Sequence, residues 1–398
     1  MQLSAERPGM SLLPLISPFI ALLILTLVGC ATKASRQSAL PKTPTSVFQT
    51  GQDIIQPESL LTLTAEQRAE FMSFFESETQ AEYAPRERVF NYLARDIGQF
   101  RFDGANLPAT TALATKTGNC VSLALVVAAL AKAVDIEVAY RASYSEPMLG
   151  FRDDLALSSN HVQSYVLAPK KNANSTYSQR DAVIIDYLSD PLDRVGEMFD
   201  GQHFLAVVYN NLAADALLAK DPSKAYWLSM KALELDPNYS PSVNLIAVIY
   251  RQQGDLASAR LWFEHGLKQP KNSVLIVGNY LRLAEQTKDV ALQKRLQALM
   301  EVADDDNPYA WYYLAEQFRK KREFTQAAKF YQKLVNVAPY LHHVNLQLAK
   351  LYVELGQERK AVDVLKQGET YAYDASSRER YEKKLSMVRQ LLTSEPRR

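Results

Sequence analysis

The 398-residue sequence contains only two cysteines, Cys30 and Cys120, and only five histidines. Two cysteines cannot build a disulfide framework, and no Cys/His cluster has the spacing of a zinc site. Charge of one sign is also scarce, since 45 Lys and Arg balance 44 Asp and Glu for a formal net charge of +1. No basic stripe of the kind that captures a nucleic acid is visible. The sequence therefore predicts no metal ion, no other cofactor and no nucleic-acid partner.

An apolar leader occupies Ser11 to Gly29 and ends in Leu27-Val28-Gly29-Cys30. Small residues directly before a cysteine resemble the lipobox of bacterial lipoproteins. That resemblance implies a signal peptide over residues 1–29 and lipidation of Cys30. The run is also long enough to span a bilayer, so an uncleaved N-terminal anchor is the alternative.

The residues after Cys30 indicate where the folded part is held. Ala31 is not the Asp associated with inner-membrane retention, so the resemblance implies an outer-membrane lipoprotein that faces the periplasm of a Gram-negative cell. Its acyl chains would anchor it stably in the lipid bilayer. Residues 31 to about 58 are rich in Ser, Thr, Pro, Lys and Gln without periodicity. We assign residues 30–60 to the lipidated cysteine and a flexible tether.

Residues 61–202 mix helix and strand signals. With 47% hydrophobic and 22% charged residues, the chain can bury ordinary cores. Helices are expected from Thr64, over Pro85 to Ile97, and from Cys120, and strands over Ile136 to Tyr144, His161 to Leu167 and Ala182 to Leu188. Helices followed by an antiparallel sheet predict an α+β domain.

Cys120 is the only cysteine left once the leader is removed, and it opens an apolar helical pattern. The peptide dipoles at a helix N-terminus favour the reactive thiolate, although a buried structural cysteine is the alternative. Three segments then resemble the transglutaminase-like branch of the papain-like cysteine hydrolases: Gly118-Asn119-Cys120, Asn160-His161-Val162 and Ile184-Ile185-Asp186-Tyr187. The resemblance covers about a third of the chain.

The resemblance implies a catalytic triad in which Cys120 is the nucleophile, His161 the base and Asp186 the orienting carboxylate. Strand alternation places His161, Gln163 and Tyr165 on one face. Many family members carry an aromatic residue shortly after the histidine, where this chain has Val162-Gln163-Ser164. The backbone amide of Cys120 is one candidate oxyanion donor, and Asn106 is a second.

From residue 203 to 396 the chain repeats every 34 residues. One landmark series is Ala216, Tyr250, Ala284, Phe318 and Tyr352, and a second is Ala225, Ala259, Gln293, Ala327 and Ala361. This period resembles the tetratricopeptide repeat. It implies about five helical hairpins, a degenerate third one, and a C-terminal capping helix, stacked into a solenoid. The expected fold is thus an α+β papain/transglutaminase-like domain followed by an all-α tetratricopeptide-repeat solenoid.

The first helix of each hairpin is expected to line a concave groove. Its candidate ligand-binding residues are Asn210, Asn244, Arg251, Arg319 and Lys350, together with Tyr312 and Glu316. Amides and cations of this kind could grip the backbone and carboxylates of an extended protein or peptide ligand. A solvated polar face is the alternative for any single one of them.

Three functions fit these patterns. The first is a membrane-anchored periplasmic cysteine hydrolase or acyltransferase that acts on protein or peptide amides and docks its substrate on the repeats. The second is a non-catalytic envelope scaffold or assembly lipoprotein that uses both domains for protein binding. Protein crosslinking by transglutaminase chemistry ranks third, because water competes with the amine unless the pocket excludes it.

Overall fold

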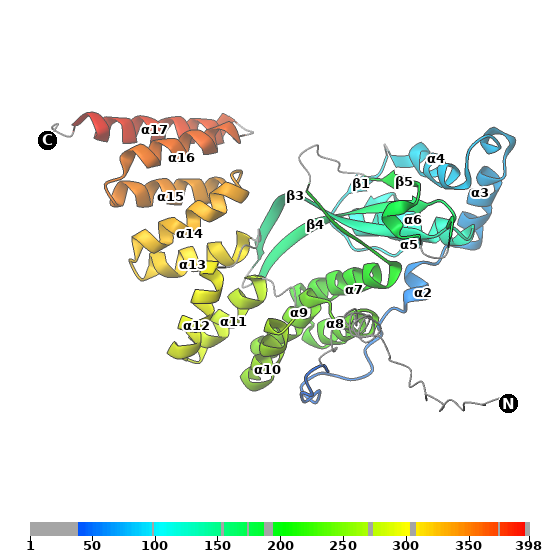
Figure 1. The fold of residues 1–398 in the computed structure, drawn as a ribbon, viewed down its shortest axis with the longest axis horizontal. Coiled ribbons are helices and arrows are strands. Elements are labelled where there is room, and N and C mark those ends of the chain that lie inside the picture. The colour runs from blue at the N-terminus through cyan, green and yellow to red at the C-terminus, as the bar shows by residue number, and fades with distance from the viewer. Residues whose placement is uncertain are drawn as a thin grey trace, which may run out of the picture. The chain divides into compact units, whose positions relative to one another are not determined.

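The computed structural model describes residues 39–97, 99–152, 155–172, 175–186, 194–269, 274–302, 308–372 and 375–394. The leader and Cys30 lie outside these described residues, so the lipoprotein assignment stays a prediction. Within the described ranges, no helix is both long and apolar enough to cross a membrane. An α+β part extends to Phe199, and a helical part begins at Gly201 (Figure 1).

The helices of the α+β part begin where the sequence supplies caps. Thr64 and Gln67 form a capping box, each side chain accepting a hydrogen bond from the other's backbone N–H. Asn119 caps the next long helix by accepting from the Ser122 N–H at 2.9 Å. That helix is apolar and buried along most of its length and packs on β4. The bounds are α2 Pro57–Leu60, α3 Ala65–Phe75, α4 Pro85–Ile97, α5 Ala109–Thr115 and α6 Cys120–Ala133.

An antiparallel four-stranded sheet has the order β5-β4-β3-β6. Its strands are β3 Val138–Arg152, β4 Leu155–Leu167, β5 Ala182–Ile185 and β6 Arg194–Phe199. A separate parallel pair joins β1 Arg101–Phe102 to β2 Thr117–Gly118. The three predicted strands are thus present, β3 and β4 are longer than predicted, and β6 is a strand that the sequence pattern does not single out. The sheet brings β4 beside β5, which is what unites the candidate site.

Five helical hairpins fill residues 201–370, and a long last helix follows them (Figure 1). Small residues of the 34-residue register, such as Ala225, Ala259, Ala327 and Ala361, are fully buried. Small side chains there let neighbouring helices approach closely. The bounds are α7 Gly201–Leu218, α8 Pro222–Leu235, α9 Ser240–Gln252, α10 Leu256–Leu267, α11 Val274–Gln286, α12 Val290–Val302, α13 Pro308–Lys320, α14 Phe324–Val337, α15 His342–Glu354, α16 Glu358–Thr370 and α17 Ala375–Ser394.

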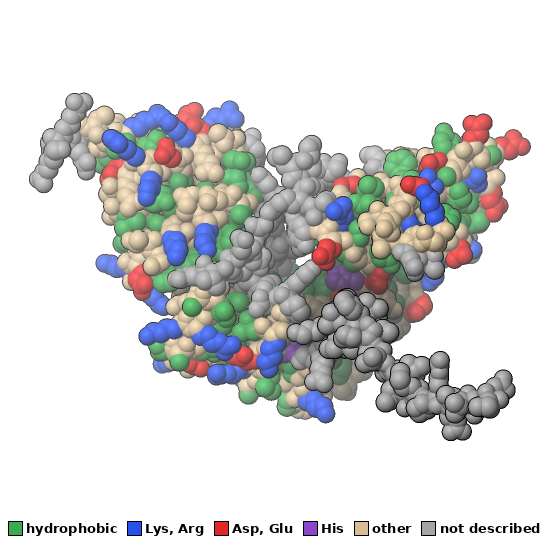
Figure 2. Space-filling model, viewed as in Figure 1, with side chains coloured by type: hydrophobic (Ala, Val, Ile, Leu, Met, Phe, Trp, Pro, Cys, Tyr) green, Lys and Arg blue, Asp and Glu red, His purple; other side chains and the backbone are tan. Residues whose placement is uncertain are grey.

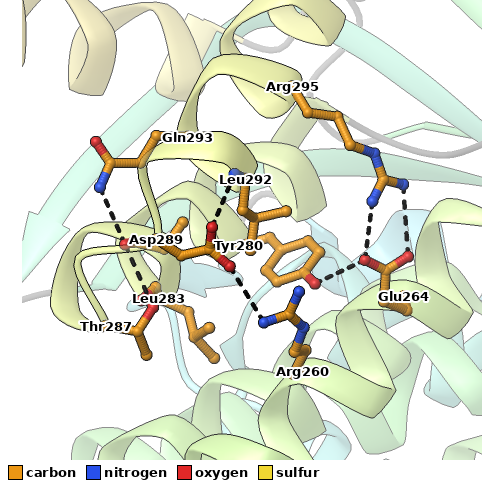
Figure 3. A network of polar contacts seen from close by, with 10 residues as sticks. Arg260, Glu264, Tyr280, Leu283, Thr287, Asp289, Leu292, Gln293 and Arg295 are labelled. Carbon is orange, nitrogen blue, oxygen red and sulfur yellow. Dashed lines mark hydrogen bonds and ion pairs between the residues drawn. The ribbon is translucent and has the colours of Figure 1, made fainter.

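The third hairpin, α11 and α12, departs from the repeat pattern at Gln293, and polar contacts bridge it to α10 (Figure 3). The Gln293 amide donates to the Ala284 carbonyl at 3.1 Å, so the larger side chain satisfies a backbone acceptor. Glu264 on α10 accepts from Tyr280 at 2.7 Å and from Arg295 at 3.1 Å. Burial raises the pKa of Glu264, but these two hydrogen bonds and the nearby Arg charges outweigh burial and lower it. Hydrogen bonds thus support the hairpin where its apolar pattern is weakest.

The chain before α2 differs from the tether that its composition predicts. Residues 40–56 lie along the first two hairpins, and Phe48 among them is only 3% exposed. Its ring stacks on Tyr226 of α8 with centroids 4.1 Å apart. The low-complexity composition therefore hides an aromatic anchor. Leu40, Ile54 and Ile55 of the same segment are partly buried against the core as well.

The helical part also packs directly on the α+β part. Phe204 in the first turn of α7 stacks on Tyr140 of β3, with centroids 4.0 Å apart and planes 10° apart. Both rings are buried. A strict nearest-neighbour solenoid would not need this contact, so the first hairpin serves as part of the core of both regions.

Candidate functional site

Cys120 is the first residue of α6 and is 9% exposed. Gly118, two residues earlier, has a φ of 142°, and a Cβ placed on it would lie 2.6 Å from the Ser122 Cβ. Only glycine avoids that collision in this backbone conformation. The turn between β2 and α6 therefore needs the Gly118-Asn119-Cys120 sequence to bring the thiol to the helix N-terminus.

His161 on β4 meets Asp186, which directly follows β5. The His161 Nε2 and the Asp186 Oδ1 lie 2.6 Å apart. The register pairs Ser164 with Ile185, which holds the end of β5 beside this part of β4. The imidazole is 4% exposed, and the carboxylate side chain is 11% exposed. Two predicted site residues separated by 25 positions are thus brought together by strand pairing.

Cys120 completes the constellation on the remaining side of the imidazole. Burial lowers the pKa of His161, but a hydrogen bond and charge attraction from Cys120, followed by those from Asp186, outweigh burial and raise it. The Nδ1 atom is buried and makes no hydrogen bond of full geometry. With Nε2 on Asp186, Nδ1 is the ring nitrogen left to exchange a proton with sulfur. The arrangement therefore places the imidazole between the carboxylate of Asp186 and the sulfur of Cys120.

A further side chain, Gln163, holds the carboxylate. Its Nε2 donates to the Asp186 Oδ2 at 2.7 Å, and its Oε1 accepts from the Tyr165 hydroxyl at 3.2 Å. Both carboxylate oxygens are therefore engaged, one by His161 and one by Gln163. The sequence places His161, Gln163 and Tyr165 on one strand face without revealing this role. The sequence offered one hint: the segment Val162-Gln163-Ser164 lacks the aromatic residue that many transglutaminase-like proteins carry shortly after the histidine.

Asn106 does not have the geometry of an oxyanion donor. Its Nδ2 donates to the Asp215 Oδ2 at 2.7 Å, and its Oδ1 accepts from the Asn119 Nδ2 at 2.8 Å. The side chain therefore connects the cap of α6 to α7 of the first hairpin. The backbone N–H of Cys120, in the first turn of a helix where amides lack intrahelical acceptors, stays as the candidate.

The predicted groove residues are largely engaged within the repeats. The Asn210 Oδ1 accepts from the Ser242 hydroxyl at 3.0 Å, and the Asn244 Oδ1 accepts from Asn279 at 3.0 Å. Asn244 is only 7% exposed, so its amide links neighbouring first helices instead of facing a ligand.

The charged members of the predicted groove also have partners or partial burial. Arg319 pairs with Glu316 at 2.7 Å, Lys350 lies 3.9 Å from Glu354, and Arg251 is half-buried in α9. On the face shown in Figure 2, the basic side chains of the repeats are interspersed with uncharged and acidic ones. Among the described residues, no group of three or more His, Cys, Asp or Glu could hold a metal ion.

Comparison with known proteins bears on the helical part. A tetratricopeptide-repeat profile matches residues 309–339, which cover α13 and α14. No curated protein sequence matches the chain. The profile, the 34-residue register and the five hairpins together identify tetratricopeptide repeats, and hence a region of the protein-interaction type.

Several solved structures are similar to part of the chain. PilF of Pseudomonas aeruginosa is 16% identical, with a TM-score of 0.35 over 48% of this chain and 87% of that one. Yeast Tom70 is 13% identical, with a TM-score of 0.39, and the match covers 48% of this chain and 42% of Tom70. YrrB, a tetratricopeptide-repeat protein with an unusual peptide-binding site, is 15% identical, with a TM-score of 0.29. The match covers 45% of this chain and 92% of YrrB.

Proposed function

We propose that this protein is a membrane-anchored cysteine hydrolase or acyltransferase of the transglutaminase-like type, which acts on protein or peptide amides in the periplasm. The observation that carries the proposal is the convergence of Cys120, His161 and Asp186, with the 2.6 Å contact between His161 and Asp186 at its centre. Three residues from three separate elements meet in the order of nucleophile, base and orienting carboxylate.

The proposed reaction depends on the two ring nitrogens of His161, one held by Asp186 and the other free to exchange a proton. The Cys120 thiolate attacks the acyl carbon, and the resulting oxyanion faces the first-turn amides of α6. As the C–N bond breaks, the His161 imidazolium gives its proton to the leaving amine, and a thioester remains on Cys120. His161 then takes a proton from water, or from a second amine, which attacks the thioester. The acyl group leaves as a carboxylic acid or a new amide, and the thiolate and the imidazolium are restored. Asp186 fixes the ring and stabilises its charged form throughout.

The anchoring part of the proposal rests on Leu27-Val28-Gly29-Cys30. Cys30→Ala should give an unprocessed precursor that incorporates no labelled palmitate, since the thiol that receives the lipid is gone. If the wild type and this variant are alike in size and neither incorporates the label, an uncleaved membrane helix is the anchor instead.

A reaction at Cys120 tests the enzymatic proposal without a known substrate. We expect iodoacetamide to alkylate Cys120 readily at pH 6.5, where an ordinary thiol with a pKa near 8.5 is only about 1% ionised. His161→Ala should slow this alkylation by up to about 100-fold at pH 6.5 and much less at pH 9. A reaction at the rate of a free thiol in both proteins would remove the enzymatic proposal.

The second candidate is a non-catalytic envelope scaffold, which the tetratricopeptide repeats favour. Complementation of a deletion strain separates the two proposals. Under the enzymatic proposal, the Cys120→Ser allele fails to complement although the protein folds. Under the scaffold proposal, that allele complements fully and substitutions on the repeats do not.

A further inference from the structure

Residues 43–55, which we call the strap, are bound to the repeats largely through their backbone. The Gln49 N–H donates to the Ser223 hydroxyl at 3.0 Å, and the Gln49 carbonyl accepts from the Trp227 Nε1 at 2.9 Å. The Tyr250 hydroxyl donates to the Pro44 carbonyl at 2.9 Å. At the other end, the Tyr209 hydroxyl donates to the Ile55 carbonyl at 2.6 Å. Side chains that hydrogen-bond to backbone groups place few demands on the sequence of the segment that they hold.

Two strap side chains add selectivity. Phe48 stacks on Tyr226 and meets Tyr250 edge-on, with centroids 5.1 Å apart. The Thr43 hydroxyl lies 2.9 Å from the Tyr250 hydroxyl and accepts from the Trp262 Nε1 at 3.0 Å. The docking surface thus consists of Tyr209, Ser223, Tyr226, Trp227, Tyr250 and Trp262, on helices α7 to α10. None of these is among the predicted groove residues.

Few residues of the strap are buried. Phe48 is its only buried residue, and its neighbour Val47 is 45% exposed. Every ordered residue loses conformational entropy, which the buried Phe48 ring, the half-buried Ile54 and Ile55 and several hydrogen bonds oppose. Segments with few buried contacts open at low free energy compared with a core. The strap is therefore suited to release and rebinding.

We propose that the α7–α10 surface is a peptide-docking site for a segment of a partner protein that carries a hydroxyl residue five positions before an aromatic one, with a turn directly before the aromatic residue, and that the strap occupies it in cis as a displaceable ligand. The partner must supply the pattern that Thr43 and Phe48 display, together with the turn in which the Phe48 N–H donates to the Thr45 carbonyl at 2.9 Å. This deepens the docking role proposed for the repeats and does not depend on Cys120.

Binding of a labelled synthetic peptide with the sequence of residues 40–56 to the full chain in detergent tests the proposal. The wild-type chain should bind this peptide weakly, because its own strap competes at a high effective concentration. The Phe48→Ala chain loses the competing anchor, so its affinity for the peptide should rise at least about tenfold. The matched control, Val47→Ala, changes an exposed neighbour and should bind as the wild type does.

Three further arms make the outcome decisive. A peptide with Phe48→Ala should bind neither chain, and Trp227→Phe in the released chain should weaken binding, because the donor to the Gln49 carbonyl is lost. Thr43→Val, which leaves the anchor ring in place, should give a smaller gain than Phe48→Ala. Cys120→Ser should leave all these affinities unchanged, which separates this site from the enzymatic proposal.

Two results would overturn the proposal. One is equal peptide binding by the Phe48→Ala and Val47→Ala chains while circular dichroism shows both folded. The other is a dimer of the wild-type chain in light-scattering measurements that the Phe48→Ala chain does not form, because the occupant would then be the strap of a second copy of this chain.

Discussion

The two regions of this protein place their functional groups by different means. In the α+β part, Cys120 lies at a helix start, His161 in β4 and Asp186 directly after β5, and the three lie together. In the repeats, the periodic residues build the helical scaffold, and the strap binds aromatic and hydroxyl side chains such as Tyr226, Trp227 and Ser223. Reactive residue types such as Cys, His and Asp can therefore be recognised in the sequence. Side chains that bind the backbone of another segment cannot, because residues such as Ser223 and Trp227 do not recur with the 34-residue period.

The largest expected effect concerns the chemical half of this comparison. Cys120→Ser and His161→Ala should each lower turnover of p-nitrophenyl acetate by about 1,000-fold or more, because nucleophile and base act as a unit. The double variant Cys120→Ala/His161→Ala should be no slower than either single one. Stopped-assay rates of the three proteins check this, and additive losses would show that the two residues act independently.

A smaller effect is expected from the support of Asp186. Asp186→Asn and Gln163→Leu should each cost about 10- to 100-fold in turnover, the value of a hydrogen bond to a charged group. Gln163→Glu should recover activity toward acid pH, since a protonated carboxyl can again donate to Asp186. The pH–rate profile distinguishes this from simple destabilisation.

A neighbouring serine provides the control for Gln163. Ser164 is 1% exposed, and its hydroxyl has no hydrogen-bond partner among the described residues. Ser164→Ala should therefore leave the pH–rate profile unchanged. If Ser164→Ala and Gln163→Leu shift the profile alike, Gln163 has no positioning role.

The packing of the repeats is tested by placing a large side chain where a small one is buried. Ala247→Trp and Ala327→Trp should each lower the free energy of unfolding by about 1–3 kcal/mol, because both alanines are fully buried between helices. Ala257→Trp, at an exposed position of α10, is the matched control and should have little effect. Urea unfolding of the three variants measures the differences.

The smallest expected change in stability comes from an electrostatic interaction at the end of α8. The hydrogen bond from His203, 2.7 Å from the Asp236 Oδ2, lowers the pKa of Asp236. A lowered carboxyl pKa stabilises the fold above the unfolded value near 3.9, and this stability is lost as the pH falls through the folded value. Asp236→Asn should therefore cost about 1 kcal/mol at pH 7 and almost nothing near pH 3.

An exposed ion pair offers the comparison for Asp236. Lys171 and Asp181 lie 3.7 Å apart with side chains 75% and 69% exposed. Asp181→Asn should change the stability by less than about 0.5 kcal/mol at either pH, since solvent screens the pair. Chemical denaturation of both variants at pH 7 and pH 3 makes the contrast.

Periodicity and residue type account for what the sequence could predict. The 34-residue register predicted five hairpins, because a buried small residue recurs once in each helix pair and so marks the length of the repeat. Strand alternation placed His161 and Gln163 on one face, but the sequence cannot show that Gln163 reaches Asp186, since that contact depends on the register of β4 with β5. The ordered strap also escaped prediction, because a single anchored ring such as Phe48 leaves no periodic trace.

The link between Asn106 and α7 determines how portable the reactive centre is. Asn119, which caps the helix of Cys120, is held by Asn106, and Asn106 is held in turn by Asp215 and, at 3.5 Å, by Asn211 of the first hairpin. A chimaera that joins the α+β part to foreign repeats would lack both partners unless they were grafted with it. To test the proposed chemistry outside this protein, the α+β part should therefore be transferred together with α7, because a boundary drawn at the start of the repeats would remove both partners of Asn106.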